Sequence, residues 1–148
     1  MARCVLGQNI QGIDHAYTLQ GWIKGVNSPS LLTTKDIGAD GQDNVSPAAD
    51  AFGYTLNYYD GDYKAVELNT NSEFQFEYEN NTNVDIGNSL FNGNIRNMSV
   101  GIKDITEANI SYKYQYDQLH RLLSAQSSTP DLNAPNYNFG TNKYQWGF

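Results

Sequence analysis

The stretch Ser111-Tyr112-Lys113-Tyr114-Gln115-Tyr116 alternates tyrosines with polar side chains. A β-strand points every second side chain to the same face, whereas a helix would scatter the tyrosines around its circumference. The same period of two recurs in residues 73–79 and in the set Phe52, Tyr54, Leu56 and Tyr58. The alternation predicts an all-β fold with little helix.

Turn signals separate these strands. The pair Asp60-Gly61 tolerates positive φ and favours a tight hairpin turn, for which we expect residues 52–59 and 63–68 to form the two arms. The pair Asn92-Gly93 gives a second signal, followed by a strand with Met98, Val100 and Ile102 on one face. The pattern is typical of consecutive antiparallel β-hairpins.

The chain of 148 residues is expected to fold as a single β segment, residues 1–148. Residues 33–50 are polar and are expected to form a surface loop insertion. Residues 126–148 carry Pro130, Pro135 and several asparagines, which predicts a loop-rich C-terminal end.

Composition and charge exclude several classes of function. The net charge is −7, with nine Lys and Arg against 16 Asp and Glu, so no basic stripe is available for nucleic acid or an anionic membrane surface. Apolar runs are only a few residues long, which predicts no membrane span, and the N-terminus lacks the apolar core of a signal peptide. The single cysteine, Cys4, excludes an intrachain disulfide.

Residues 116–122 read Tyr-Asp-Gln-Leu-His-Arg-Leu, which resembles a tyrosine–aspartate (YD) repeat of the Rhs family. Two further stretches resemble Rhs proteins of the Bacteroidetes type. One spans residues 11–27 and contains Tyr17, Gly21 and Trp22. The other begins at Leu90 and contains Asn92, Gly93, Asn94 and Ile95. The resemblance covers roughly residues 3 to 125.

The resemblance implies a structural role. Rhs proteins, which include bacterial polymorphic toxins, wind consecutive β-hairpins into a twisted or spiral sheet. This sheet forms a shell that encloses or presents a toxin or another C-terminal domain. This implies a non-enzymatic segment without cofactor or metal, part of a larger secreted or cell-surface protein. Its partners would be neighbouring repeats and a toxin cargo, with self-association through open sheet edges. The chain departs from the family in being too short to close a shell and in lacking the self-cleavage region and the toxin domain.

The motif residues have plausible structural roles on physical grounds. Tyrosines can cover apolar neighbours while their hydroxyls meet water. Asp117 is expected to accept hydrogen bonds from nearby backbone amides in an Asx-type turn, and Arg121 to pair with Asp117 or stack on a tyrosine. The structural set is therefore Tyr112, Tyr114, Tyr116, Asp117, Arg121 and Leu122.

The sequence also contains two candidate chemical sites. Cys4 with His15 or His120 would be a nucleophile and base, but no oxyanion or elbow signature surrounds them. Glu73, Glu77 and Glu79 would offer paired carboxylates, but strand alternation predicts an exposed polar face instead.

Two binding alternatives remain open. The loop containing Asp36, Asp40, Asp43 and Asn44 offers calcium-type oxygens, but its spacing fails the EF-hand pattern and a solvated acidic loop is favoured. Exposed Tyr and Trp side chains would also suit an extracellular carbohydrate-binding or adhesion module. That module is the alternative to the structural function.

Overall fold

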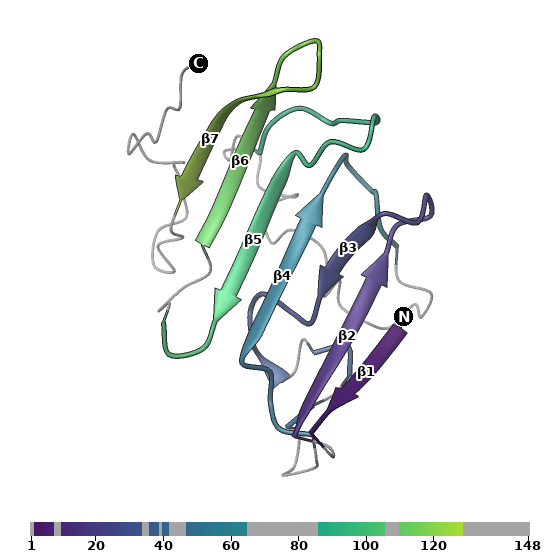
Figure 1. The fold of residues 1–148 in the computed structure, drawn as a ribbon, viewed down its shortest axis with the longest axis vertical. Coiled ribbons are helices and arrows are strands. Elements are labelled where there is room, and N and C mark those ends of the chain that lie inside the picture. Colours follow the sequence, from purple (N-terminus) through teal and green to yellow (C-terminus); the bar gives the residue numbers. More distant parts are fainter. Residues whose placement is uncertain are drawn as a thin grey trace.

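The computed structural model describes residues 2–7, 10–33, 36–38, 40–41, 47–64, 86–105 and 110–128. Seven strands form one antiparallel sheet in which each strand pairs with its neighbours in the chain (Figure 1). They are β1 (Ala2–Leu6), β2 (Gln11–Tyr17), β3 (Ile23–Val26), β4 (Phe52–Asn57), β5 (Asn97–Ile102), β6 (Ile110–Tyr116) and β7 (Leu122–Ser128). The all-β prediction is confirmed.

The described residues contain no α-helix. Within the same ranges, no helix has the length and apolar character needed to cross a membrane.

The predicted strands around the aromatic alternations are present. Met98 pairs with Leu56 on one side and with Tyr112 on the other, so the apolar positions of β4, β5 and β6 lie in one row across the sheet. Tyr54 and Val100 pair in the next row. This register places β-branched and aromatic side chains next to each other, which is how cross-strand pairs stabilise a sheet.

Three expectations about the strands need correction or fall outside the described residues. The predicted hairpin joins residues 52–59 to residues 63–68. Its first arm contains β4, which pairs with β3 and with β5. Most of its second arm, residues 65–68, lies outside the described residues. Strand β7 was not predicted, and it extends three residues into the expected loop-rich end at 126–148. The alternating stretch 73–79 lies outside the described residues.

The two faces of the sheet have an unusual distribution of side chains. One face carries small and polar residues that are almost all buried, and its members include Asp14, Thr55, Asn57, Asn97, Ser99, Ser111 and Lys113. The other face carries the apolar and aromatic residues, and most of these are only partly buried, among them Tyr54, Met98, Val100, Tyr112 and Tyr114. We refer to them as the polar face and the aromatic face.

Long connections cover the polar face. The segment after β3 approaches β4 so closely that a β-carbon on Gly53 would lie 2.3 Å from the carbonyl oxygen of Ser28. The segment before β5 lies over the other half, where the side chain of Asn97 donates to the carbonyl of Ile86 at 3.0 Å. The loops therefore bury the polar face, which explains why its side chains are polar: they bond to loop backbone and to each other.

A β-bulge directs Lys24 into this polar layer. Ala16 pairs with Gly25 and Tyr17 pairs with Ile23, so Lys24 is the extra residue of β3. Its ammonium group, which is buried, donates to Asn57 at 2.5 Å and to Asp62 at 2.6 Å. Asn57 in turn donates to Asn97 at 2.6 Å, which extends the network from β3 to β5.

Candidate functional site

The three stretches that resemble Rhs sequences meet in space, at the end of the sheet where β2 turns into β3 and β6 turns into β7. Trp22 and Gly93 belong to two of these stretches and lie in contact: a β-carbon on Gly93 would be 3.3 Å from Cζ2 of Trp22. Gly93 has a φ of 88°, in the region that favours glycine. We call this meeting point the motif junction, defined by residues 17–23, 90–96 and 112–122.

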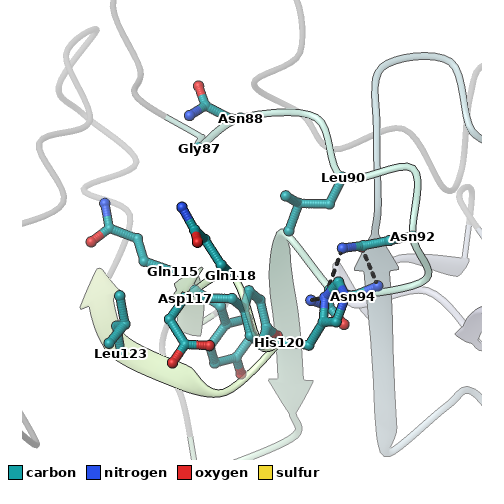
Figure 2. A pocket seen from close by; sticks show the side chains of 12 residues that line it. Gly87, Asn88, Leu90, Asn92, Asn94, Gln115, Asp117, Gln118, His120 and Leu123 are labelled. Atoms are coloured by element: carbon teal, nitrogen blue, oxygen red, sulfur yellow. Dashed lines mark hydrogen bonds between the residues drawn. The ribbon is translucent and has the colours of Figure 1, made fainter.

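Hydrogen bonds join the second and third stretches. The side-chain amides of Asn92 and Asn94 lie 3.0 and 3.1 Å from Nδ1 of His120 (Figure 2). The hydroxyl of Tyr116 donates to the carbonyl of Ile95 at 3.0 Å. The backbone amide of Tyr114 donates to the carbonyl of Arg96 at 2.9 Å, which continues the β5–β6 pairing beyond the strand.

Asp117 organises the turn between β6 and β7. Its Oδ1 accepts from the backbone amides of Leu119 and Arg121, both at 2.9 Å. Its Oδ2 accepts from Nε of Arg121 at 2.6 Å, so Arg121 pairs with the carboxylate. The backbone amide of Arg121, followed by its side chain, holds the pKa of Asp117 below its ordinary value.

The tyrosines of β6 form a partly buried ladder. The rings of Tyr112 and Tyr114 stack with centroids 6.5 Å apart and an interplanar angle of 10°. Burial raises the pKa of Tyr114 and that of Tyr116. Both groups therefore stay neutral phenols over the physiological range.

Other motif residues lie at the edges of the junction. Trp22 packs on Tyr58 with ring centroids 5.0 Å apart. Tyr17 is exposed and stacks on His15, and Leu122 is exposed on β7. Gly21 has a φ of 84° in the β2–β3 turn, a backbone conformation that favours glycine.

A pocket of about 550 Å³ lies beside the junction, between the segment before β5 and the β6–β7 hairpin (Figure 2). Amide side chains contribute much of its lining, together with an aspartate, a histidine and two tyrosines. Its polar members are Asn88, Asn92, Asn94, Gln115, Asp117, Gln118 and His120. Sequence patterns gave no sign of this pocket, because its two walls are far apart in the chain.

The structure does not support a Cys–His pair within the described residues. Cys4 lies exposed on β1 and makes no hydrogen bond there to His15 or to His120. His120 is instead engaged by Asn92 and Asn94. Glu73, Glu77 and Glu79 lie outside the described residues.

The expectation of a solvated acidic loop is wrong for Asp36 and Asp40. Both carboxylates are buried, 8% and 2% exposed, and they lie beside Asp14 of β2. The loop folds back over the polar face and brings them there. Asp43 and Asn44 lie outside the described residues.

Comparison with protein-family models, with curated protein sequences and with solved structures finds no match for this chain.

Proposed function

We propose that the chain is a non-enzymatic structural segment of an Rhs/YD-repeat protein. In this role the sheet is part of a β-hairpin wall that encloses or presents a toxin or another C-terminal domain. Neighbouring repeats would continue the sheet, and the whole protein would be secreted or displayed at the cell surface.

The motif junction carries this proposal. Its residues direct their polar groups at one another: Asn92 and Asn94 at His120, Tyr116 at Ile95, and Asp117 at Arg121. Side chains that bind a ligand usually keep some hydrogen-bonding capacity for it, whereas side chains that shape a fold satisfy each other. Together with the contact between Trp22 and Gly93, these bonds hold three chain segments against one another. A structural repeat requires such contacts.

The aromatic face and the sheet edges give further support. Tyr54, Met98, Val100 and Tyr112 remain partly exposed, whereas described parts of the connections approach the opposite face at Gly53 and Asn97. Among the described strands, β1 and β7 each have one neighbour only, so their outer edges are available for pairing (Figure 1). A wall segment needs both features: an inner surface to contact its cargo and edges to meet the next repeat.

The rival function is carbohydrate binding, and the pocket of Figure 2 is the observation that favours it. Asn88 and Gln118 line that pocket, and amide side chains beside tyrosine rings are the groups that recognise sugar hydroxyls and ring faces. The two functions differ in what the tyrosine ladder does.

Truncation of the ladder separates these functions. If Tyr114 packs the wall, Tyr114→Ala should lower the free energy of unfolding by roughly 2–4 kcal/mol, as large-to-small aromatic changes do. Gln118→Ala in the pocket is the matched control and should stay within about 0.5 kcal/mol of the wild type. Thermal and urea unfolding of both variants provides the stability measurement.

A glycan-array screen of the same proteins completes the test. The structural proposal predicts no specific glycan bound by the wild-type chain. A specific glycan that binds the wild type and is lost in a stably folded Gln118→Ala variant would overturn the proposal in favour of a carbohydrate-binding module.

A further inference from the structure

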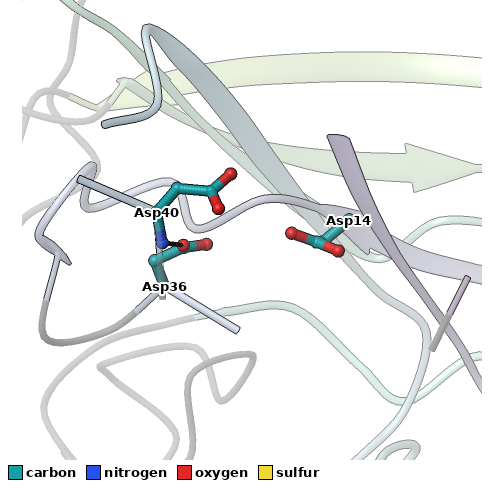
Figure 3. Close-up of side chains that lie close together, drawn as sticks. All are labelled: Asp14, Asp36 and Asp40. Atoms are coloured by element: carbon teal, nitrogen blue, oxygen red, sulfur yellow. Dashed lines mark hydrogen bonds between the residues drawn. The ribbon is translucent and has the colours of Figure 1, made fainter. Parts of the chain in front are cut away.

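Three aspartates from two separate parts of the chain lie together on the polar face. Asp14 belongs to β2, and Asp36 and Asp40 belong to the connection between β3 and β4 (Figure 3). One carboxylate oxygen from each lies within 4.8 Å of those from the other two. The three residues are 0%, 8% and 2% exposed, so all are more than nine-tenths buried.

Each of these carboxylates has one oxygen with a partner and one without. Arg3 donates to Oδ2 of Asp14 at 2.9 Å and to Oδ1 of Asp40, and the backbone amide of Asp40 donates to Oδ2 of Asp36 at 2.5 Å. The remaining oxygens are Asp14 Oδ1, Asp36 Oδ1 and Asp40 Oδ2, and they are buried without a hydrogen-bond partner. Such oxygens are costly unless a positive group compensates them.

The cluster carries more negative than positive charge. Arg3 is the guanidinium paired with it, so three carboxylates and one cation leave a formal charge of −2.

The carboxylates occupy space that is free because residues 12 and 38 are glycines without a side chain. A β-carbon on Gly12 would lie 1.9 Å from Oδ2 of Asp40, and one on Gly38 would lie 2.1 Å from Oδ2 of Asp14. Any side chain at either position would push a carboxylate away. The backbone is thus shaped to bring the carboxylates of Asp14 and Asp40 close to each other.

We propose that Asp14, Asp36 and Asp40 bind a calcium ion. A calcium ion prefers oxygen ligands at 2.3–2.6 Å, so two ligands on opposite sides of it are separated by about 5 Å at most, a span that accommodates this cluster. Its charge of +2 neutralises the formal surplus, and backbone carbonyls and water complete its usual six to eight ligands. Magnesium fits less well because it demands about 2.0–2.1 Å and gives up its waters reluctantly, whereas these side chains are buried.

The ion would join elements that the sheet alone does not connect. Asp14 is fixed in β2, while Asp36 and Asp40 are on the connection that covers the polar face. Binding would hold this connection against the N-terminal hairpin. The motif junction is not involved, so the calcium site and the structural function can be tested separately.

Calorimetric titration of the full chain, freed of metal with a chelator, tests the site directly. We expect one calcium ion to bind per chain. At a calcium concentration of about 1 mM, which is in the affinity range of extracellular calcium modules, the melting temperature should rise. Magnesium at the same concentration should raise it less. A wild-type titration without calcium-specific heat, together with an unchanged melting temperature, overturns the proposal.

Asp36→Asn is the decisive variant, since an asparagine oxygen can still accept the hydrogen bond from the amide of Asp40 while the charge is removed. It should lose most of the calcium-dependent rise and, in chelator, melt no lower than the wild type. Asp60→Asn is the matched control, because its carboxylate pairs with Arg96 instead, and it should keep the full calcium response. An equal calcium response in wild type and Asp36→Asn contradicts the site. If Asp36→Asn does not fold, the wild-type titration decides.

Discussion

Trp22 packs against Gly93 at the motif junction, although strands β3 and β4 lie between the two residues in the chain. The edge of the indole occupies the space into which any β-carbon at position 93 would point. The same indole packs at a tilt against the ring of Tyr58, so it has contacts on two sides. This relationship gives the first prediction.

Replacing Gly93 with alanine should destabilise the fold for two reasons. A φ of 88° is strained for alanine, and the new methyl group would lie 3.3 Å from the indole of Trp22. Gly21→Ala is the matched control: its φ of 84° is nearly the same, and nothing lies within 4 Å of its added β-carbon.

We expect the control to cost about 1–2 kcal/mol from backbone strain. Gly93→Ala should cost more, by the roughly 1–3 kcal/mol typical of an overpacked contact. Urea unfolding measures both variants. Equal losses would show that the Trp22 contact contributes nothing.

The buried ion pair between Lys24 and Asp62 gives a second prediction. The two side chains are 1% and 2% exposed, and the ammonium and carboxylate lie 2.6 Å apart. Lys24→Met leaves Asp62 buried without this partner and should cost about 3–5 kcal/mol.

A double-mutant cycle tests the coupling. Adding Asp62→Asn to Lys24→Met should restore part of the loss, because the buried charge is removed while an asparagine oxygen can still accept from the amide of Tyr58. Simple additivity of the two single losses would contradict a direct pair.

Asp60 and Arg96 give a pH-dependent prediction. Arg96 donates to Oδ1 of Asp60 at 2.6 Å and is the main reason that the pKa of Asp60 lies below its ordinary value of 3.8. A carboxyl whose pKa is lowered by folding stabilises the fold above its unfolded pKa, and this contribution disappears as the pH falls through the folded pKa.

We therefore expect the difference in unfolding free energy between wild type and Asp60→Asn to be constant near neutral pH and to shrink below about pH 4. Urea unfolding at a series of pH values measures it. Asp104→Asn is the control, since Asp104 is exposed and has a φ of 61°, which asparagine tolerates well. A difference that stays constant down to pH 2 would show that the pair does not shift the titration of Asp60.

Sequence periodicity predicted strands β4, β5 and β6 because their aromatic face alternates with polar residues. It missed β7, in which leucines are followed by small polar residues without a period. The bulge at Lys24 could not be predicted from periodicity either, because it depends on how Ala16 and Tyr17 pair with the neighbouring strand.

The buried polar face could not be predicted from alternation alone. The pattern in residues 111–116 does not say which face is covered, and the usual expectation is that polar residues face water. Here the connections cover the face that carries Ser111 and Lys113, and the face that carries the tyrosines stays partly exposed. For the same reason Asp36 and Asp40 seemed solvated: their partner Asp14 lies in a distant strand.

The proposed wall segment is tested most directly by sedimentation velocity of the isolated chain over a range of protein concentrations. Because β1 and β7 present open edges among the described strands, we predict concentration-dependent self-association and only marginal thermal stability, despite the net charge of −7. A single monomeric species at high concentration with a high melting temperature would contradict the account and identify a self-contained domain.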